Sequence, residues 1–421
     1  MKIFKFGGSS IHNADHIKNV KNIISAHTDD TLIVVVSAIS KTTNMLEKLL
    51  ECYTEHKGDI PKYLNAVKMV HLKLMNELFE NKAQHPVFDE VNQRFEQLLF
   101  ELTEVKPQNY EKDYDRIVSF GELISSTIIG HYLQKEGVLV TMVDIREVLK
   151  TDTTYRNANV DYAESGKNAK KVFKNADSEN VVFLTQGFIA SVKDTGETTT
   201  LGREGSDFTA AVLAYLIDAE SVTVWKDVNG IYSADPKQFD DFVPIPHLSY
   251  HEMIELSYFG ARVLHPKTIK PLQNKAIPLY VKSFYEIEKK GTLINGEKPD
   301  FIPPVKIIKN GQTLITLSPK DFSFILEKHL SYIFSLLDKY HIQVNLFQHS
   351  AISFSIVIDG KNRFFENLIA DLGDLFNVLY NSDLQLLTVR HYIDEELDKL
   401  LNKRKVYVEQ RTRKTARFVI G

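Results

Sequence analysis

Short apolar runs rich in β-branched residues alternate with longer helical patterns along the first part of the chain. Each run is four to six residues long, which is typical of a strand buried inside a sheet. Strands that alternate with helices in this way favour a mostly parallel sheet wrapped by helices. The pattern therefore predicts an α/β domain. Its predicted strands are Ile3–Phe6, Leu32–Ser37, Val138–Val143, Val181–Gln186 and Ser221–Trp225.

The pattern changes between about residues 44 and 118, where apolar residues recur at spacings of three and four. The stretches MLEKLL, YLNAVKMVHLKLMNELF and FDEVNQRFEQLLFEL show this spacing, which places their apolar residues on one face of a helix. Such a stripe is more typical of core packing than of a ligand site. We therefore interpret this region as a helical insertion in the α/β domain, which as a whole spans residues 1–295.

Proline and glycine are frequent from Gly291 to Gly311, which favours a connection between domains. We place a linker at 296–311 and a second region at 312–421. Its order of elements is β-α-β-β-α-β, the ferredoxin-like arrangement, and a second, abbreviated unit follows. The predicted elements are strand 313–318, helix 324–340, strands 342–347 and 353–359, helix 362–373, strands 375–380 and 384–392, a short helix from Asp394, and strands 406–412 and 416–420.

Composition and charge exclude several classes of protein. The 421 residues are 43% hydrophobic and 25% charged, which is ordinary for a soluble protein of two or three domains. The net charge of −4 gives no global attraction to nucleic acid or anionic membrane, so small anionic ligands must be bound locally. Cys52 is the only cysteine, which rules out an intrachain disulfide and argues against a cysteine-based zinc site.

We expect a cytoplasmic location. An apolar strand begins at residue 2, which leaves no room for a signal peptide, and no apolar run approaches the roughly 20 residues of a membrane span. The stretch KRKVYVEQRTRKTAR, residues 403–417, holds seven basic residues and one acidic residue, which is one signal of nucleic-acid binding. Because VYVEQRT alternates apolar and polar residues, we favour a solvated edge strand there and expect neither a nucleic-acid nor a membrane partner.

The first ten residues, MKIFKFGGSS, predict a strand, a glycine turn and a helix that starts at about Asn13. Glycines allow backbone N–H groups to approach an anion, a helix N-terminus favours negative charge, and Lys5 would add a positive charge. A tight turn without a ligand is the alternative interpretation. Neither the Walker pattern G-x-x-x-x-G-K-[ST] nor the nicotinamide fingerprint G-x-G-x-x-G is present at this turn.

Four more clusters place polar residues at strand ends and helix starts. Asn44 and Asp207 can serve simply as helix caps, and Glu122 can simply stabilise the start of its helix. Asp227, in contrast, lies in a polar loop that directly follows a strand. The clusters are SAISKTTNML at 37–46, SFGELIS at 119–125, TLGREGSDFTAAVLA at 200–214 and VWKDVNGIYSADPK at 224–237.

Seven ordered blocks give the chain a family resemblance. The blocks KFGGSS, VVSAISKTTN, SFGELIS, TQGF, TLGREGSD, WKDVNGIYSADP and YFGARVLHP resemble those of the aspartate kinases in the amino-acid kinase superfamily, from residue 1 to about 295. The tail more loosely resembles their ACT-type regulatory domains. The resemblance implies an α/β/α sandwich that transfers the ATP γ-phosphoryl group to the β-carboxylate of L-aspartate.

The resemblance also implies roles for individual residues. Phosphoryl transfer depends on positioning and charge compensation. The implied magnesium ion would be held mainly through the nucleotide phosphates, with no dedicated protein metal site. An arginine fork suits the substrate carboxylate, and an acid suits its ammonium group. The implied residues are Lys5 and Asp207 for catalysis; Lys5, Gly7, Gly8 and Ser9 for phosphate; Ser37, Thr43, Glu122, Arg203 and Ser206 for aspartate; and Lys226, Asp227, Tyr232, Lys237, Arg262 and Val263 for ATP.

Three positions depart from the family pattern: Glu204 replaces a common glycine, Lys226 stands where some relatives have threonine, and Arg262 stands where lysine is common. The effector loop departs as well. Lysine-sensing relatives carry a stretch similar to VDLITTSE, and the aligned stretch here is VNLFQHSA, residues 344–351. The loss of two acids predicts weak or absent lysine inhibition. The candidate effector residues are Gln343, Val344, Asn345 and Gln348.

We expect the tail to pair two chains into a homodimer or a higher homo-oligomer, because ACT-type units usually bury their edge strands. Two alternatives stay open at this point. One is another kinase of the superfamily that acts on carbamate, glutamate or a nucleoside monophosphate. The other is a non-catalytic amino-acid sensor, against which the intact Lys5 and Asp207 argue. We expect no fusion to homoserine dehydrogenase, because the chain is short for such a fusion and lacks the dinucleotide fingerprint.

Overall fold

The computed structural model describes residues 1–27, 31–80, 84–173, 181–261, 263–321, 323–360, 362 and 364–421. The chain forms two compact units. Two short segments, residues 232–243 and 258–261, interrupt the first unit in sequence but belong to the second. This division differs there from the single boundary drawn at residue 295. The first unit is Met1–Ile231, Pro244–Ser257 and Arg262–Pro299, and the second is Tyr232–Val243, Tyr258–Ala261 and Asp300–Gly421.

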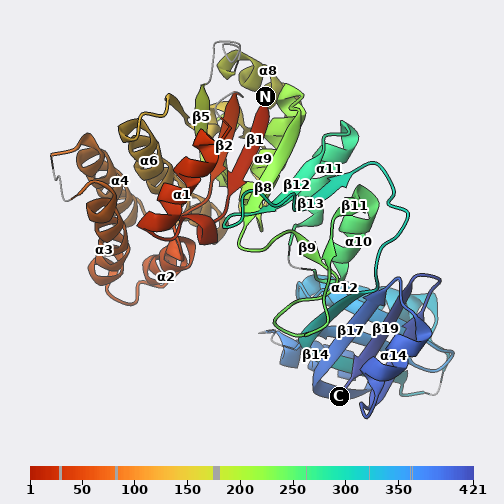
Figure 1. Ribbon diagram of the computed structural model, residues 1–421. Coiled ribbons are helices and arrows are strands. Elements are labelled where there is room, and N and C mark those ends of the chain that lie inside the picture. The colour runs from red at the N-terminus through yellow and green to blue at the C-terminus, as the bar shows by residue number, and fades with distance from the viewer. Residues whose placement is uncertain are drawn as a thin grey trace. The chain divides into compact units, whose positions relative to one another are not determined.

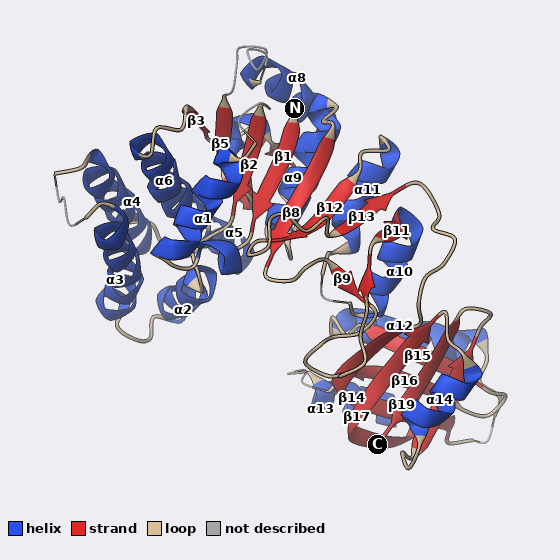
Figure 2. Ribbon diagram, in the orientation of Figure 1, coloured by secondary structure: helices blue, strands red, loops and turns tan. Residues whose placement is uncertain are grey.

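An eight-stranded sheet with the order β11-β13-β12-β8-β1-β2-β5-β3 forms the centre of the first unit (Figure 1). The strands from β12 to β3 are parallel to one another, and β13 is antiparallel to β12. Helices cover both faces (Figure 2), which explains why every residue of β2 and β5 is buried. The predicted strands are thus confirmed. The strands are β1 Lys2–Phe6, β2 Leu32–Val36, β3 Val140–Val143, β5 Val182–Gln186, β8 Ser221–Lys226, β11 His247–Ser249, β12 Leu279–Ser283 and β13 Thr292–Asn295.

Two helices, α6 and α9, are buried along almost their whole length. Helix α6 packs against β3, β5 and the helix α4 of the insertion, and α9 packs against β1, β8, α8 and α11. Their first turns therefore reach the edge where β1 and β2 end. The helices outside the insertion are the 3₁₀ helix η1 Gly8–Ile11, α1 Ala14–Ser25, α6 Phe120–Lys135, α7 Ile145–Val148, α8 Tyr162–Val172, α9 Gly205–Ile217, α10 Tyr250–Phe259 and α11 Pro266–Asn274.

The predicted helical insertion is confirmed, and it begins at Thr42 rather than at about residue 44. Its helices pack on one another and, through α4, on α6 (Figure 1). Two small sheets, β4-β6-β7 and β10-β9, complete the strands of this part of the chain. The elements are α2 Thr42–Glu55, α3 Ile60–Leu78, α4 Pro86–Thr103, α5 Tyr110–Val118, β4 Lys150–Thr151, β6 Ile189–Val192, β7 Thr198–Thr200, β9 Ile231–Tyr232 and β10 Pro244–Ile245.

A six-stranded sheet with the order β15-β16-β14-β17-β19-β18 forms the second unit. The predicted β-α-β-β-α-β order is confirmed in β14, α12, β15, β16, α13 and β17, whose apolar side chains share one core. The α/β fold followed by a ferredoxin-like region is therefore correct. The elements are β14 Val305–Pro319, α12 Glu327–Lys339, β15 Val344–His349, β16 Phe354–Asp359, α13 Phe365–Gly373, β17 Phe376–Arg390, α14 Asp394–Leu401, β18 Val406–Arg411 and β19 Thr415–Ile420.

Strands β14 and β17 pair with each other along almost their whole length. The strands predicted separately at 375–380 and 384–392 are therefore one strand. The sequence between them, Asn381 to Asp383, is rich in turn-forming residues, which explains the wrong prediction. In the structure these residues form an irregular part of β17. There Asp383 has a φ of 56°, and the register with β14 shifts. The predicted abbreviated unit consists of the outer halves of β14 and β17 together with α14, β18 and β19.

The linker predicted at 296–311 is only partly a connection, because β14 begins at Val305. Asn310 and Gly311 do not end a strand. Gly311 has a φ of 63°, and the register with β17 shifts between Lys309 and Gln312. A β-bulge of this kind places a glycine inside a strand, so a sequence that is typical of a loop continues the sheet.

Candidate active site

The carboxyl ends of four parallel strands lie at one edge of the first sheet. Phe6 at the end of β1 is opposite Val36 at the end of β2 and opposite Trp225 near the end of β8. Gln186 at the end of β5 is in turn opposite Val36. The residues that follow these strands are therefore neighbours, and β1 and β8 lie where open α/β sheets bind ligands.

A buried ion pair joins two of the predicted residues. The Lys5 Nζ atom lies 2.6 Å from the Asp207 Oδ1 atom, and the Lys226 Nζ atom lies 3.6 Å from Oδ2. Burial alone would raise the pKa of Asp207, but the two lysines outweigh it and lower that pKa. Asp207 is therefore ionised, and the three side chains together carry one positive charge at the end of β1 and β8. The helix cap of α9 is Glu204, so Asp207 is not simply a cap.

The glycine turn after β1 passes close to Lys5 and to the loop after β2. A Cβ atom on Gly7 would lie 3.1 Å from the Lys5 Nζ atom, and one on Gly8 would lie 3.0 Å from the carbonyl oxygen of Ala38. Ser9 is exposed, and the hydroxyl of Ser10 donates to the Trp225 carbonyl at 3.2 Å. These contacts bring a backbone without side chains beside a buried ammonium group, which suits a phosphate.

Glu122, in the first turn of α6, is 3% exposed. Its Oε1 atom accepts a hydrogen bond of 3.3 Å from the backbone N–H of Ala38. Among the described residues, its Oε2 atom is buried without a hydrogen-bond partner. Burial raises the pKa of Glu122 to about 8 against the weaker effect of the Ala38 hydrogen bond. An unsatisfied buried carboxylate oxygen is costly, so this position suits a cationic ligand group.

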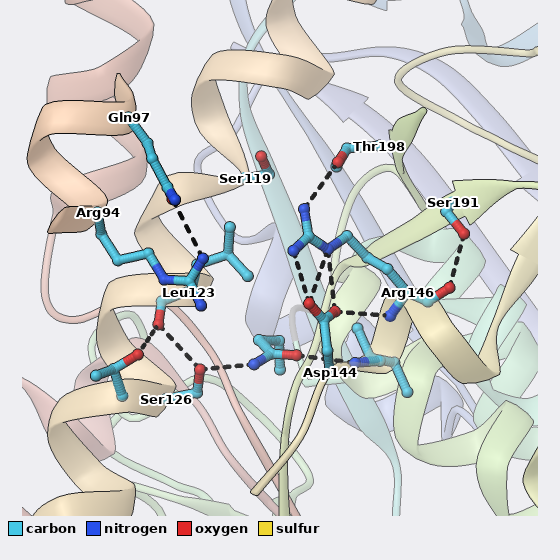
Figure 3. Close-up of polar contacts among 12 residues, drawn as sticks. Arg94, Gln97, Ser119, Leu123, Ser126, Asp144, Arg146, Ser191 and Thr198 are labelled. Carbon is cyan, nitrogen blue, oxygen red and sulfur yellow. Dashed lines mark hydrogen bonds and ion pairs between the residues drawn. The ribbon is translucent and has the colours of Figure 1, made fainter. Parts of the chain in front are cut away.

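Hydrogen bonds fix α6 to the strand ends. The hydroxyl of Ser125 donates to the Ser37 carbonyl at 2.6 Å. The hydroxyl of Ser126 donates to the Leu123 carbonyl at 3.1 Å, a contact drawn as a dashed line in Figure 3. It also accepts from the Gln186 side chain at 2.8 Å. Gln186 thereby ties the end of β5 to the turn of helix that carries Glu122. This network was not predicted from the sequence, although the TQGF block contains Gln186.

The other residues expected to bind aspartate lie on three elements. Ser37 follows β2 and is half-buried, as is Thr43 in the first turn of α2. Ser206 in the first turn of α9 is buried, and a Cβ atom on Gly187 would lie 2.5 Å from its Cβ atom. Gly187 follows β5, so this close approach brings α9 against the strand ends. Arg203 is exposed just before α9.

The loop that carries Arg203 is held by a residue that sequence reasoning missed. The Asp115 carboxylate accepts hydrogen bonds from the backbone N–H and the hydroxyl of Thr200, at 2.8 and 2.5 Å, and from the backbone N–H of Arg156 at 3.0 Å. Burial raises the pKa of Asp115 to about 6. Asp115 lies four residues before the SFGELIS block, which is the one signal that could have drawn attention to it.

Glu204 shows why a glycine is common at its position. Its φ is 54°, a left-handed conformation that costs a residue with a Cβ atom free energy and suits glycine. Its side chain is half-buried, and its Oε2 atom is buried without a partner among the described residues. The departure from the family pattern therefore adds a carboxylate at the residue that directly follows Arg203.

The residues expected to bind ATP are divided between the two units. Lys226 and Asp227 lie at the end of β8 in the first unit, which also holds Val263. Tyr232 and Lys237 belong to the segment that is part of the second unit. The remaining residue of this set, Arg262, lies outside the described residues.

The candidate effector residues lie along β15 and just before it, in the second unit. Gln343 and Gln348 are exposed, and Val344 packs at the edge of the core. The Asn345 side chain accepts a hydrogen bond from the Lys309 Nζ atom at 3.0 Å. It also donates to the Gln312 Oε1 atom at 2.8 Å and to the Asp359 Oδ1 atom at 3.0 Å. Its carboxamide is therefore engaged within the chain.

A family profile described as "Amino acid kinase family" matches residues 1–283, which is more than half of the chain. The chain belongs to the amino acid kinase family. Aspartokinase 1, chloroplastic, of Arabidopsis thaliana is 30% identical over 375 residues, which is 87% of this chain and 65% of that protein. The bifunctional aspartokinase/homoserine dehydrogenase of Buchnera aphidicola is 30% identical over 92% of this chain and 47% of its own length.

Solved structures of amino acid kinases cover the whole chain. E. coli aspartokinase III in complex with aspartate and ADP has a TM-score of 0.83 and 26% identity, over 100% of this chain and 96% of that one. Clostridium acetobutylicum aspartate kinase has a TM-score of 0.78 at 20% identity and shows the shared fold. The resemblance drawn from the seven blocks is confirmed. The chain spans less than two thirds of the length of the curated relatives named above.

Two features are absent from the described residues. No helix among them is both long and apolar enough to cross a bilayer. In the same part of the chain, no group of three or more His, Cys, Asp or Glu side chains is arranged to hold a metal ion.

Proposed function

We propose that the chain transfers the γ-phosphoryl group of ATP to the β-carboxylate of L-aspartate, releasing ADP and 4-phospho-L-aspartate. The observation that carries this proposal is the geometry at one sheet edge. There, the buried Lys5–Asp207 pair lies beside a glycine turn, and the buried carboxylate of Glu122 keeps one oxygen without a partner among the described residues. The solved relative with 26% identity binds aspartate and ADP, which supports the same pair of ligands here.

Lys5 and Asp207 have distinct tasks in this proposal. Phosphoryl transfer gains most from fixed charges around the transferring group. The Lys5 ammonium group stabilises the negative charge that is shared by the transferring phosphoryl group and the acceptor carboxylate. Asp207 orients Lys5, since the two side chains are 2.6 Å apart and buried. Gly7, Gly8 and Ser9 bring backbone N–H groups to the phosphates.

The aspartate substrate has two carboxylates and one ammonium group. The Oε2 atom of Glu122, which has no partner among the described residues, accepts a hydrogen bond from the ammonium group. The positive charge of the ammonium group compensates the negative charge that Glu122 acquires on ionisation. Arg203 binds the α-carboxylate as a bidentate fork. Hydroxyl groups complete the pocket, and they come from Ser37, Thr43 and Ser206.

ATP is bound by the residues that the family resemblance implies, and magnesium arrives with its phosphates. The chain fits this arrangement, because both oxygens of Asp207 face lysine ammonium groups and the described residues hold no group of three or more carboxylate, histidine or cysteine side chains arranged for a metal. The ion supplies charge neutralisation at the phosphate oxygens when it is bound. The implied ATP set is Lys226, Asp227, Tyr232, Lys237, Arg262 and Val263.

Aspartate-dependent release of ADP from ATP tests the function. We expect turnover with L-aspartate and none with carbamate, L-glutamate or UMP at the same concentration. Turnover with one of those acceptors alone would identify another kinase of the family. Binding of an amino acid with no ADP release from any acceptor would identify a sensor. The reaction is the first step in the biosynthesis of lysine, threonine and methionine, and a cytoplasmic location stays a prediction.

Replacing Arg203 by lysine is expected to raise the KM for aspartate by about tenfold or more, although the charge is kept. A lysine ammonium cannot form the two parallel hydrogen bonds by which a guanidinium binds a carboxylate. Initial rates over a range of aspartate concentrations at saturating ATP give this KM. Arg404→Lys, an exposed arginine of the second unit, is the control. An unchanged aspartate KM in Arg203→Lys would place the carboxylate elsewhere.

We also propose that the ferredoxin-like half of the second unit pairs two chains into a homodimer. Its outer strands are β15 and the first half of β17, and both expose large apolar side chains. Phe347 on β15 is 53% exposed, and Leu379 on β17 is 73% exposed. Pairing between chains would cover such edges. Light scattering on the purified protein gives the assembly mass, and a monomer at all concentrations would exclude this pairing.

Lysine is expected to inhibit the enzyme weakly or not at all. The aligned loop lacks two of the acids found in lysine-sensing relatives, and each charge-assisted hydrogen bond is worth roughly 1.5 to 3 kcal/mol. The Asn345 side chain is moreover already bonded to Lys309, Gln312 and Asp359. Titrating activity with lysine, and separately with threonine and methionine, tests this expectation. Strong inhibition by micromolar lysine that is abolished by Asn345→Ala or Gln348→Ala would show that the loop binds lysine.

A further inference from the structure

The segment 232–243 is built onto the sheet of the second unit. Phe239 packs against the cluster of buried side chains that includes Leu387, Val389 and Phe418. Ala234 forms a parallel bridge with Lys306 on β14. The segment thus occupies the outer edge of the first half of β14, where the sheet would otherwise end.

One residue of the sheet, Lys306, contacts both ends of this segment, which we call its two arms: the near arm with Ser233 and the far arm with Asp241. Its backbone N–H donates to the Ser233 carbonyl at 2.7 Å. Its Nζ atom donates to the Asp241 carbonyl at 3.1 Å and to the Asp241 Oδ2 atom at 2.6 Å, and it lies 5.2 Å from the centre of the Phe239 ring. The Lys306 side chain is 7% exposed, whereas that of Asp241 is 80% exposed.

The two ends of the segment are also hydrogen-bonded to each other. The Ser233 backbone N–H donates to the Val243 carbonyl at 2.9 Å, and the Val243 N–H donates to the Ser233 hydroxyl at 3.0 Å. Asp235 accepts from the backbone N–H of Lys237 at 2.9 Å, and the rings of Tyr232 and Phe242 meet edge to face. Lys306 therefore holds the segment at Ser233 and at Asp241, and Lys237 lies between these two residues in the sequence.

A lysine at this position is not explained by stability alone. Burying an ammonium group costs solvation free energy, and a carboxylate that stays exposed to water compensates only part of it. A methionine would fill the same space without this cost. The hydrogen bond from Lys306 also lowers the pKa of Asp241. The pair has a definite geometric result, since it joins the far arm of the segment to the sheet.

We propose that Lys306 is a positioning residue for nucleotide binding. From β14 in the sheet of the second unit, it sets the conformation of segment 232–243, and thereby the conformation of the chain that carries Tyr232 and Lys237. This inference rests on the proposed function, which assigns those two residues to ATP. It goes beyond that function because it makes the affinity for ATP depend on a residue of the second unit. The affinity for aspartate, whose residues lie in the first unit, does not depend on it.

Lys306→Met tests the proposal, because it keeps the backbone hydrogen bond to Ser233 and removes only the ammonium group. We expect the KM for ATP to rise at least about fivefold, in line with the loss of a charge-assisted hydrogen bond. The kcat and the KM for aspartate should stay within about twofold of wild type. Asp241→Asn, at a position whose side chain is 80% exposed, should have the same direction of effect, and Lys306→Arg should restore much of the ATP affinity.

The matched control is Lys339→Met, which removes an exposed ion pair of 2.8 Å with Asp371 in the same unit. It should leave all three kinetic constants unchanged. Hydrogen exchange gives a readout apart from activity: the amides of residues 232–243 should exchange faster in Lys306→Met. An unchanged ATP KM in both Lys306→Met and Asp241→Asn would overturn the proposal. A parallel loss of kcat and of both substrate affinities would also overturn it, since it would indicate a general structural role.

Direct binding separates this inference from the proposed function. If the wild-type chain does not phosphorylate aspartate, the proposed function fails, and calorimetric titration with magnesium and ADP still tests Lys306. Weaker ADP binding in Lys306→Met than in wild type would support the positioning role. Equal affinity in the two chains, or no ADP binding by wild type, would overturn it.

Discussion

Lys5→Met and Asp207→Ala are each expected to lower kcat by about 10²- to 10³-fold, the usual cost of losing one preorganised electrostatic group. Lys5 supplies the buried positive charge beside the glycine turn, and Asp207 fixes it from a distance of 2.6 Å. Lys226 also pairs with Asp207, at 3.6 Å, so loss of the aspartate disturbs two cations at once. The measurement is the rate of aspartate-dependent ADP release at saturating ATP and aspartate.

The control for Lys5→Met is Lys2→Met, the same change on the same strand. The Lys2 side chain is partly exposed, with its Nζ atom 3.7 Å from Glu220, and its loss should leave kcat unchanged. Removing one partner of a buried pair lowers the free energy of unfolding by about 3 to 5 kcal/mol, so circular dichroism must confirm that Asp207→Ala is folded at the assay temperature. A folded variant with near-normal kcat would contradict the assignment of that residue.

Glu122→Gln is expected to raise the KM for aspartate by about tenfold or more, with the KM for ATP nearly unchanged. The substrate ammonium group loses a buried ionic partner, and a hydrogen bond to a charged group is worth about 1.5 to 3 kcal/mol. Initial rates over a range of aspartate concentrations provide the measurement. Glu136→Gln, at the other end of helix α6, is the control. If aspartate saturation is the same in Glu122→Gln and wild type, the ammonium group binds elsewhere.

The same variant should change the pH dependence of stability. Glu122 has a pKa of about 8 in the folded chain and an ordinary value of 4.5 when unfolded. Between these pH values the unfolded chain binds fewer protons, so Glu122 progressively lowers the free energy of unfolding as pH rises, by up to about 5 kcal/mol. Relative to wild type, Glu122→Gln should therefore gain stability from pH 5 to pH 8 in urea unfolding. A difference that does not vary with pH would contradict the raised pKa.

Much of the fold could be predicted because its signals are local. The buried strand β2 is a continuous apolar run, and the insertion has clear helical spacing. The failures occur where a distant partner overrides a local signal. Asn310 and Gly311 are typical of a turn, but β17 pairs on both sides of them, and a bulge replaces the expected end of the strand.

The candidate site was predictable to a similar extent. The family resemblance implied Lys5 and Asp207, and the structure places their side chains 2.6 Å apart. The contact of Lys226 with Asp207 depends on the alignment of β8 with β1, which no local pattern contains. Asp115 was missed for the same reason, because its partner Thr200 is far away in sequence. The assignment of residues 232–243 to the second unit likewise depends on tertiary contacts.

The shared strands β14 and β17 have a consequence for how such a chain can be assembled in evolution. Residues 312–385 begin and end at neighbouring points of the sheet, since Lys309 is opposite Leu386. The first ferredoxin-like half is thus a cassette within a hairpin of the other half. Deleting it would join Lys309 to Leu386 through Asn310-Gly311, a dipeptide favoured in two-residue hairpin turns. A gene can therefore gain or lose this cassette in a single event while the strands that support residues 232–243 keep their pairing.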